Sequence, residues 1–285
     1  MKNLPRTDLA CEANALWQSD SGATTRLKGV IARDEQLNGY GVTSVEITDD
    51  EGSKELCKPI GKYFTLELDK LLHRQENAFE DAVSALSELI RRLPIPQEGD
   101  VVVACLGNSD ITPDAVGPVA ADNIVVTRHL KQNLPQDFAA FRSVSVVRPG
   151  VLATSGIESA EAVKSFCSTI SPSCVFVVDA LASADLTRLG RTVQITDTGI
   201  APGSGVGNDR AELSSAYLGV PVVAVGVPTV VDAAAFSNDN AAKGMFVTPR
   251  TVDDLVLRTG KLIGYGINLA LHNGMTCGDA DMLLE

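Results

Sequence analysis

Histidine and paired cysteines are scarce in this chain of 285 residues. The three histidines, His73, His129 and His272, lie far apart, and no His-x-x-x-His or His-Glu pair exists. A zinc-dependent hydrolytic site is therefore poorly supported. None of the six cysteines forms a Cys-x-x-Cys pair, and several lie inside apolar runs, where cysteine behaves as a small hydrophobic residue. The cysteine pattern indicates a reducing cytoplasm without a disulfide framework.

Basic clusters and long apolar runs are also missing. The net charge is −12, from 24 basic and 36 acidic residues. Nucleic-acid binding needs a basic footprint, so we expect no direct nucleic-acid partner. No apolar run reaches membrane-spanning length and no secretory signal is present, so we expect no membrane association. A soluble protein with a peptide or small-molecule partner fits this composition better.

Apolar residues, in contrast, are plentiful and regularly spaced. They make up 45% of the chain, which is enough for a full core. After Asp100, apolar strands alternate with helical segments, and this pattern predicts a three-layer α/β/α sandwich around a central mixed, largely parallel sheet. The expected strands cover 101–106, 144–147, 174–178, 192–195 and 221–227, and the expected helices cover 115–132, 159–170, 182–189, 209–218 and 252–272.

The first hundred residues follow a different pattern. Residues 1–22 are polar and are predicted to form a mobile arm. Short β-rich segments follow, with the hairpin signal Asn38-Gly39 between the first two, and 77–93 has apolar residues at helical spacing. We therefore predict a single domain over 9–285, in which a small β-rich and helical N-terminal lobe (9–100) precedes the α/β core (101–285).

Two acids occupy equivalent places behind apolar strands. Asp114 follows the strand at 101–106, after a Gly107-Asn108 turn, with Thr112 as a plausible helix N-cap. Asp179 ends the strand at 174–178. Each acid alone has a simple structural explanation, because carboxylates favour helix N-termini. If the two strands are neighbours, however, both carboxylates face one cleft. Two close carboxylates do not both ionise easily, so one of them keeps its proton. The ionised acid can then activate water, and the protonated acid can donate to a leaving amine.

A glycine-dense loop from Gly199 to Asn208 is open to several interpretations. It lacks the Gly-Lys-Ser/Thr ending of a phosphate-binding loop, so turns that need positive φ, or room for an extended peptide, are the alternatives to a phosphate cradle. Asp197-Thr198-Gly199 matches the short motif of pepsin-like proteases, but those enzymes are all-β. We interpret Asp197 as a loop acid that supports the site. Ser204 has no nearby His and no Gly-x-Ser-x-Gly elbow, which disfavours a serine mechanism.

Ordered motifs run through nearly the whole chain. They are Arg6–Ala10, Leu106–Asn108, Thr112–Pro118, Val126–Leu130, Pro149-Gly150, Ser155–Glu158, Asp179–Ala182, Gln194–Gly199, Pro202–Asn208, Gly226–Ala233, Phe246–Pro249 and Asn268–His272. Together they resemble the germination protease family of spore-forming bacteria. The resemblance implies a homotetrameric endopeptidase of the forespore and spore core, which degrades small acid-soluble spore proteins, and a fold related to hydrogenase-maturation proteases.

The resemblance also assigns roles to residues. It implies that the functional carboxylates are Asp114 and Asp179, and that the chain is a zymogen that cleaves its own N-terminal segment. The stretch Arg6–Glu12 resembles the processing site, so we predict cleavage between Asp8 and Leu9, which makes residues 1–8 a propeptide-like leader. Candidates for substrate-loop or supporting roles are Asn108, Glu158, Asp197, Gly203, Ser204 and Gly205.

Three departures from the family pattern and two alternatives accompany this interpretation. The leader is shorter than usual, Asn108–Ile111 replaces a stretch that more often carries an aromatic residue, and Ala235–Met245 is shortened. No cofactor is expected. The alternatives are a metal-dependent peptidase that uses the same two carboxylates as ligands of a divalent cation, and a catalytically silent peptide-binding homologue.

Overall fold

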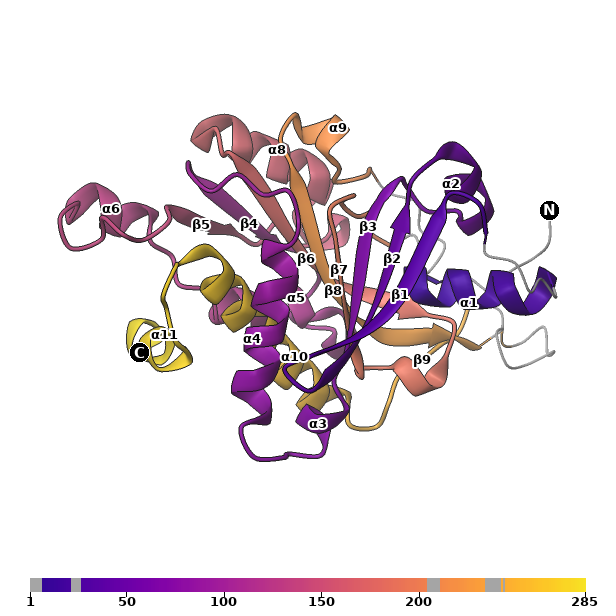
Figure 1. Cartoon of the computed structure of the whole chain (residues 1–285). Helices are drawn as coiled ribbons and strands as arrows, with labels where there is room; N and C mark the ends of the chain where they lie inside the picture. Colours follow the sequence, from indigo (N-terminus) through magenta and orange to yellow (C-terminus); the bar gives the residue numbers. More distant parts are fainter. Residues whose placement is uncertain (1–6, 22–26, 204–210, 234–241, 243) are drawn as a thin grey trace.

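One mixed sheet organises the computed structural model, which describes residues 7–21, 27–203, 211–233, 242 and 244–285 (Figure 1). The strand order is β1-β2-β3-β7-β8-β6-β4-β5, and β9 pairs with the far end of β8. The strands are β1 (Val30–Leu37), β2 (Tyr40–Ile47), β3 (Gly61–Glu67), β4 (Val101–Cys105), β5 (Val144–Val147), β6 (Cys174–Ser183), β7 (Thr192–Thr196), β8 (Val222–Asp232) and β9 (Phe246–Val247).

The sheet has a parallel part and an antiparallel part. Strands β5, β4, β6 and β8 run parallel, and β7, β3, β2 and β1 continue the sheet in antiparallel pairings. The parallel part belongs to the 101–285 core. The N-terminal strands extend the same sheet, because β3 pairs with β7, so the β-rich N-terminal portion and the core share one sheet.

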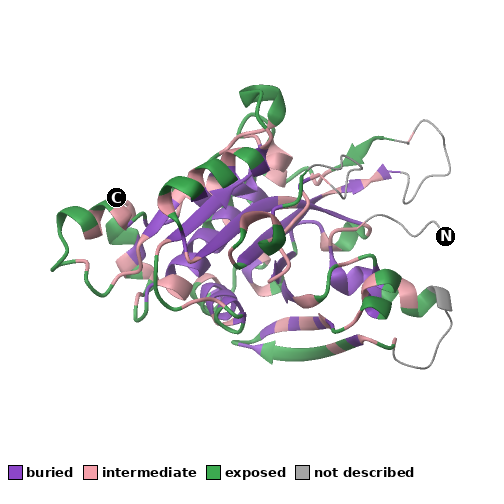
Figure 2. Ribbon diagram, turned by 90° about the horizontal axis from the view of Figure 1, so that it is seen from above, coloured by how far each residue is buried: buried purple, intermediate pink, exposed green. Residues whose placement is uncertain are grey.

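Helices cover both faces of the parallel part, as the period-2 pattern of its strands requires. In β4, Val101, Val103 and Cys105 face a core formed with α4 (Ala78–Arg91), α5 (Val116–Asp122) and α10 (Val252–Leu271). The alternate residues, Val102 and Ala104, face a second core under α8 (Ser159–Ile170) and α9 (Ser215–Leu218). The central strands are buried and the outer helical faces exposed (Figure 2). The predicted α/β/α fold class is confirmed.

The prediction of a mobile arm over residues 1–22 is wrong for its second half. Ala10–Ser21 forms helix α1, which packs with α2 (Asp50–Leu56) on the N-terminal strands. Ala10 and Ala13 enter a small core with Val45 and Tyr63. These two small side chains give the helix a buried face that its mostly polar sequence does not predict.

Tertiary contacts also changed several predicted element boundaries. The expected helix 115–132 is divided into α5 and α6 (Arg128–Asn133). The Asn268 side chain explains this division, since it accepts from the Val125 N–H and donates to the Asn123 carbonyl, each at 2.9 Å. These bonds replace the helical partners of both groups.

The expected helix 182–189 does not form. Its first two residues belong to β6, which stays paired with β8 as far as Ser183, and a single 3₁₀ turn, η2 (Leu186–Arg188), follows. The described part of the expected helix 209–218 is helical only in α9. The remaining elements are α3 (Asp69–Leu72), η1 (Thr112–Asp114), α7 (Leu152–Ser155) and α11 (Cys277–Leu284). Within the described ranges, no helix combines the length and apolarity that crossing a membrane requires.

Candidate active site

A cavity of about 500 Å³ lies at the carboxyl ends of β4 and β6 and is lined by both predicted catalytic acids, Asp114 and Asp179. The predicted processing-site residue Asp8 lines the same cavity, although it is more than a hundred residues away in the sequence. Carboxyl ends of neighbouring parallel strands are where open α/β sheets usually bind ligands. The fold therefore brings together the three residues on which the sequence interpretation depends.

Asp179 owes its position to the end of β4. The N–H of Leu106 donates to the Val178 carbonyl at 2.8 Å, and β4 then leaves the edge of β6. Asp179 is the next residue of β6, on the face that Val175 and Val177 present to the core under α8. Its side chain is buried, and one carboxylate oxygen accepts from the Ala180 N–H at 2.9 Å.

Asp114 is held by the turn that follows β4. The N–H of Asn108 donates both to the backbone carbonyl of Asp114 at 3.1 Å and to its carboxylate at 2.9 Å. Gly107 adopts φ +105, a conformation that favours glycine, and so returns the chain toward Asp114. Thr112 is not the helix cap that we predicted: it lies inside the 3₁₀ turn η1, where Ile111 occupies the N-cap position.

The predicted scissile bond is docked on the sheet. Asp8 donates its N–H to the Ala182 carbonyl at 2.9 Å, and its carboxylate accepts from the Ala182 N–H at 2.8 Å. Its carbonyl accepts from Gln194 Nε2 at 2.9 Å. Leu9 is fully buried against Leu181. In this arrangement, residues 7–9 take the place beside β6 that β4 has left.

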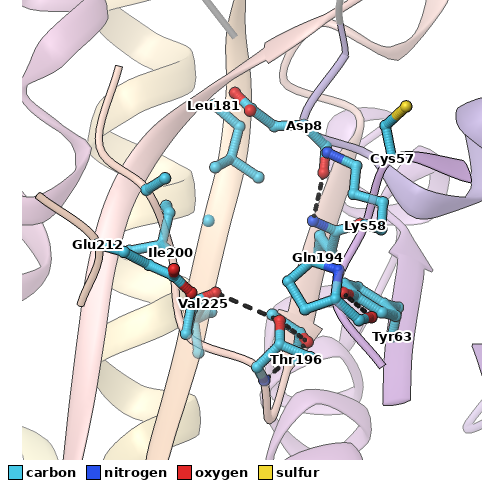
Figure 3. Close-up of a pocket in the computed structure, with 16 residues that line it drawn as sticks. Asp8, Cys57, Lys58, Tyr63, Leu181, Gln194, Thr196, Ile200, Glu212 and Val225 are labelled. Carbon is cyan, nitrogen blue, oxygen red and sulfur yellow. Dashed lines mark hydrogen bonds between the residues drawn. The ribbon is translucent and has the colours of Figure 1, made fainter. Parts of the chain in front are cut away.

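A second cavity of about 230 Å³ lies on the other side of this segment, and Asp8 and Leu181 line both cavities. Figure 3 shows Asp8 next to Lys58 and Gln194 at one side of this second cavity. Lys58 is half-buried, and its ammonium donates to the Thr7 carbonyl at 2.8 Å. Burial lowers the pKa of Lys58, while the charge of Asp8 opposes that shift. The N-terminal segment therefore separates two cavities that it also lines.

Sequence reasoning overlooked Lys58, Glu12 and Gln194. Gln194 belongs to the Gln194–Gly199 motif, and this membership is the only sequence signal that marks it. Lys58 follows the short helix α2 without any pattern that marks it. Glu12 lies in the processing-site stretch, three residues after Leu9, where a helix-capping glutamate is expected.

The predicted supporting residues lie in different places. Gly203 forms part of the cavity wall, and the N–H of Asn108 donates to the cavity-lining Asp114. Asp197 instead accepts from the Lys62 N–H at 2.8 Å and so fixes the start of β3. Glu158 occupies the N-cap position of α8, next to the cavity-lining Ser159. The remaining two candidates, Ser204 and Gly205, lie outside the described residues.

Metal-ligating side chains do not gather in the described ranges. No three His, Cys, Asp or Glu side chains there form a group that could hold a metal ion. Asp114 and Asp179 are oxygen ligands of the kind that hard cations prefer, but two carboxylates without further protein ligands do not make a zinc site.

Fold and cavity together define an α/β protein with a carboxylate-lined site at its strand ends. Its residues 7–243 match the germination protease family, and the chain belongs to that family. A germination protease from Caldanaerobacter subterraneus subsp. tengcongensis is 39% identical, with 98% of each chain covered. Another, from Priestia megaterium, is 37% identical over 98% of this chain and 75% of that protein. The chain is thus a peptidase of the germination type.

One solved structure adds a distant comparison. A nickel–iron hydrogenase maturation protease from Thermococcus kodakarensis matches 59% of this chain and 92% of its own, at 18% identity and a TM-score of 0.35.

The alignment with the Caldanaerobacter relative extends over 322 residues, more than the 285 of this chain. The relative therefore contains residues without a counterpart here. The segment that we predicted to be shortened, Ala235–Met245, lies largely outside the described residues.

Proposed function

We propose that this chain is an endopeptidase that degrades small acid-soluble spore proteins during germination. We further propose that it acts as a homotetramer in the forespore and spore core, and that it is made as a zymogen cut between Asp8 and Leu9. The family membership supports the peptidase class. The observation that supports the chemistry is the cavity shared by Asp114, Asp179 and Asp8.

In the proposed mechanism, water attacks the peptide directly. The ionised member of the Asp114/Asp179 pair takes a proton from water while the water oxygen bonds to the carbonyl carbon of the peptide. The protonated member donates its proton to the leaving nitrogen as the C–N bond breaks, which leaves a carboxylic acid and an amine. In this proposal either carboxylate can serve as the base while the other serves as the acid, because interacting acids share their protons.

The contacts of residues 7–8 suggest how a substrate chain binds. The backbone N–H and carbonyl of Ala182 and the amide of Gln194 now bind Asp8. The Ala182 groups belong to an edge of β6 that β4 has left, whereas the Gln194 side chain comes from β7. An extended peptide can bind such an edge through backbone hydrogen bonds. Removal of residues 1–8 leaves these groups available to a substrate and takes away Asp8, which lines both cavities.

The test is incubation of the purified chain with a small acid-soluble spore protein. We expect fragments from the wild type, and a rate lowered about 10²–10⁴-fold in Asp114→Asn and in Asp179→Asn. Asp253→Asn, which removes the same charge from the exposed start of α10, is the matched control and should cleave normally. Activity lost with a chelator and restored by a divalent cation would replace this mechanism by the metal-dependent one. Substrate binding without cleavage would identify a silent homologue.

A further inference from the structure

Glu12 is a buried carboxylate at the start of α1 that the proposed mechanism does not use. Its side chain is 5% exposed. One of its oxygens accepts from the Ser183 hydroxyl at 2.5 Å, and the other accepts from the Ala184 N–H at 2.8 Å. Both donors lie at the end of β6, the strand that carries Asp179. Glu12 thus connects the first turn of α1 to the end of this strand.

The same carboxylate lies one hydroxyl group away from the nitrogen of the predicted scissile bond. The Leu9 N–H donates to Thr7 Oγ1 at 3.0 Å, and this hydroxyl donates to Glu12 Oε2 at 2.5 Å. Leu9 accepts the first helical bond of α1, from the Ala13 N–H, so Leu9 is the N-cap and Glu12 is the third helical residue. A glutamate at this position normally reaches back to the N-cap nitrogen itself. Here the Thr7 hydroxyl stands between them.

Cleavage between Asp8 and Leu9 would remove the Thr7 hydroxyl that joins Leu9 to Glu12, and it would create a new charge at the Leu9 nitrogen. Water adds across the bond, the Asp8 carbonyl becomes a carboxylate, and the Leu9 nitrogen becomes an amine that takes up a proton. Thr7 lies on the leader side, so its hydroxyl leaves with the leader. A carboxylate that is then short of one donor faces a new ammonium group, and opposite charges within about 4–6 Å favour each other's ionised forms.

We infer that Glu12 is the built-in acceptor for the α-ammonium group that processing creates at Leu9, and that this ion pair ties the new chain end to the strand carrying Asp179. The inference rests on the proposed cleavage between Asp8 and Leu9. Glu12 is then a positioning residue: it touches no substrate and acts through the end of β6.

Two other cations face Glu12 and compete for it. Arg188 Nε, from η2, lies 3.8 Å from Glu12 Oε1. Lys58, from the connection before β3, now binds the Thr7 carbonyl and would lose that partner together with the leader. Either cation, if it moved onto Glu12, would leave the Leu9 ammonium unpaired. The titration of the new α-amino group therefore distinguishes these outcomes.

The experiment produces the Leu9 terminus independently of the catalytic pair. In the full chain, residues 5–8 are replaced by Ile-Glu-Gly-Arg, and added factor Xa cuts before Leu9, as intact-mass spectrometry verifies. The pH dependence of acetic anhydride labelling then gives the pKa of the Leu9 α-amino group, in the folded chain and in urea. We compare this parent with Glu12→Gln and with Asp50→Asn, which removes an exposed carboxylate from the neighbouring helix α2.

We expect a pKa at least ~1 unit above the ordinary range of about 7.7–8.0 in the folded parent and in Asp50→Asn, and an ordinary value in Glu12→Gln and in urea. An ordinary value in the folded parent overturns the inference without reference to any variant. A raised value that persists in Glu12→Gln also overturns it; near-UV circular dichroism checks that this variant folds. Failure of the wild-type chain to cut itself would instead count against the proposed function.

Discussion

At the scale of single residues, the position of Asp114 depends on one glycine. Gly107 has φ +105, and a Cβ added there would lie 2.0 Å from the Asp114 carbonyl oxygen. The turn that closes on Asp114 therefore has room only for a hydrogen at this position. Gly156, in contrast, has a similar sign of φ (+73) but nothing within 4 Å of an added Cβ. A comparison of Gly107 with Gly156 therefore separates the cost of a positive φ from the cost of a steric clash.

We predict that Gly107→Ala lowers the free energy of unfolding by about 1–3 kcal/mol or more and abolishes most peptidase activity, because the clash displaces Asp114. Gly156→Ala should cost about 1 kcal/mol, the left-handed penalty alone, and keep its activity. Urea unfolding and cleavage assays on both variants check this. Equal stability and equal activity in the two variants would show that the Gly107 turn does not hold Asp114.

A second residue-scale prediction concerns His272, whose side chain is 2% exposed. Burial is the main cause that lowers its pKa to about 4 from 6.5, and the cations Lys131 and Arg142 act in the same direction. Its Nδ1 accepts from the Arg142 N–H at 3.2 Å. The unfolded chain thus binds a proton more readily than the folded chain between these two pKa values. The stabilising contribution is complete above pH 6.5 and is lost as the pH falls toward 4.

We expect this loss to reach about 3 kcal/mol, at about 1.4 kcal/mol per pKa unit. In His272→Gln, a neutral side chain that can still accept from Arg142, this part of the pH dependence should vanish. Urea unfolding of both proteins at pH 7 and pH 4.5 measures the difference. If the two proteins lose the same free energy of unfolding between these pH values, the assignment to His272 is wrong.

At the scale of elements, helix α10 approaches α5 closely at its glycines. A Cβ on Gly264 would lie 2.7 Å from the Asn123 carbonyl oxygen and 2.9 Å from that of Ala120. Both obstacles are backbone atoms, which cannot rotate away. Since Asp114 ends η1 and α5 begins two residues later, this packing also fixes the helix behind the candidate site.

We predict that Gly264→Ala destabilises the protein by about 1–3 kcal/mol, through overpacking, although alanine in a helix interior normally gains up to about 1 kcal/mol over glycine. Gly278→Ala in α11 is the matched control. An added Cβ there meets nothing nearer than Thr276 Oγ1 at 3.8 Å, so its stability should stay equal or rise. Thermal melts show whether each substitution raises or lowers the stability of the protein. A stabilised Gly264→Ala would mean that the two helices have room to separate.

The element scale also shows what the sequence predicted and what it did not. The apolar strand 174–178 and the following Asp179 were recognised because both lie in one local pattern. The continuation of β6 to Ser183 was missed, because it depends on the far end of β8, whose Val231 pairs with Ser183. The break before α6 depends on Asn268, which no local pattern connects to Val125. Local patterns predicted local elements, and distant partners set the boundaries.

The candidate site follows the same rule. Asp114 and Asp179 were paired from equivalent positions after two strands, and the parallel pairing of β4 and β6 brings such positions to one edge. Gln194 and Lys58 were not selected, because they come from β7 and from the connection before β3. Their contact with residues 7–8 exists only once the antiparallel strands have joined the sheet.

At the scale of the whole molecule, the site is assembled from segments that lie far apart within the family match over residues 7–243. The parallel core supplies Asp114 and Asp179, the antiparallel strands supply Gln194, and the N-terminal segment lies between them with Asp8 in the cavity. Because the predicted cleavage point lies in the same cavity as the predicted catalytic pair, self-cleavage of the chain can serve as an assay of Asp114 and Asp179 without any added substrate.

Intact-mass spectrometry of the purified full chain over time therefore tests directly whether Asp114 and Asp179 cleave the Asp8–Leu9 bond. We expect the wild type to lose residues 1–8 and the Asp253→Asn control to do the same. Asp114→Asn and Asp179→Asn should each remain uncut, or be cut about 10²–10⁴-fold more slowly. If Asp114→Asn processes itself at the wild-type rate, the carboxylate pair does not carry the reaction.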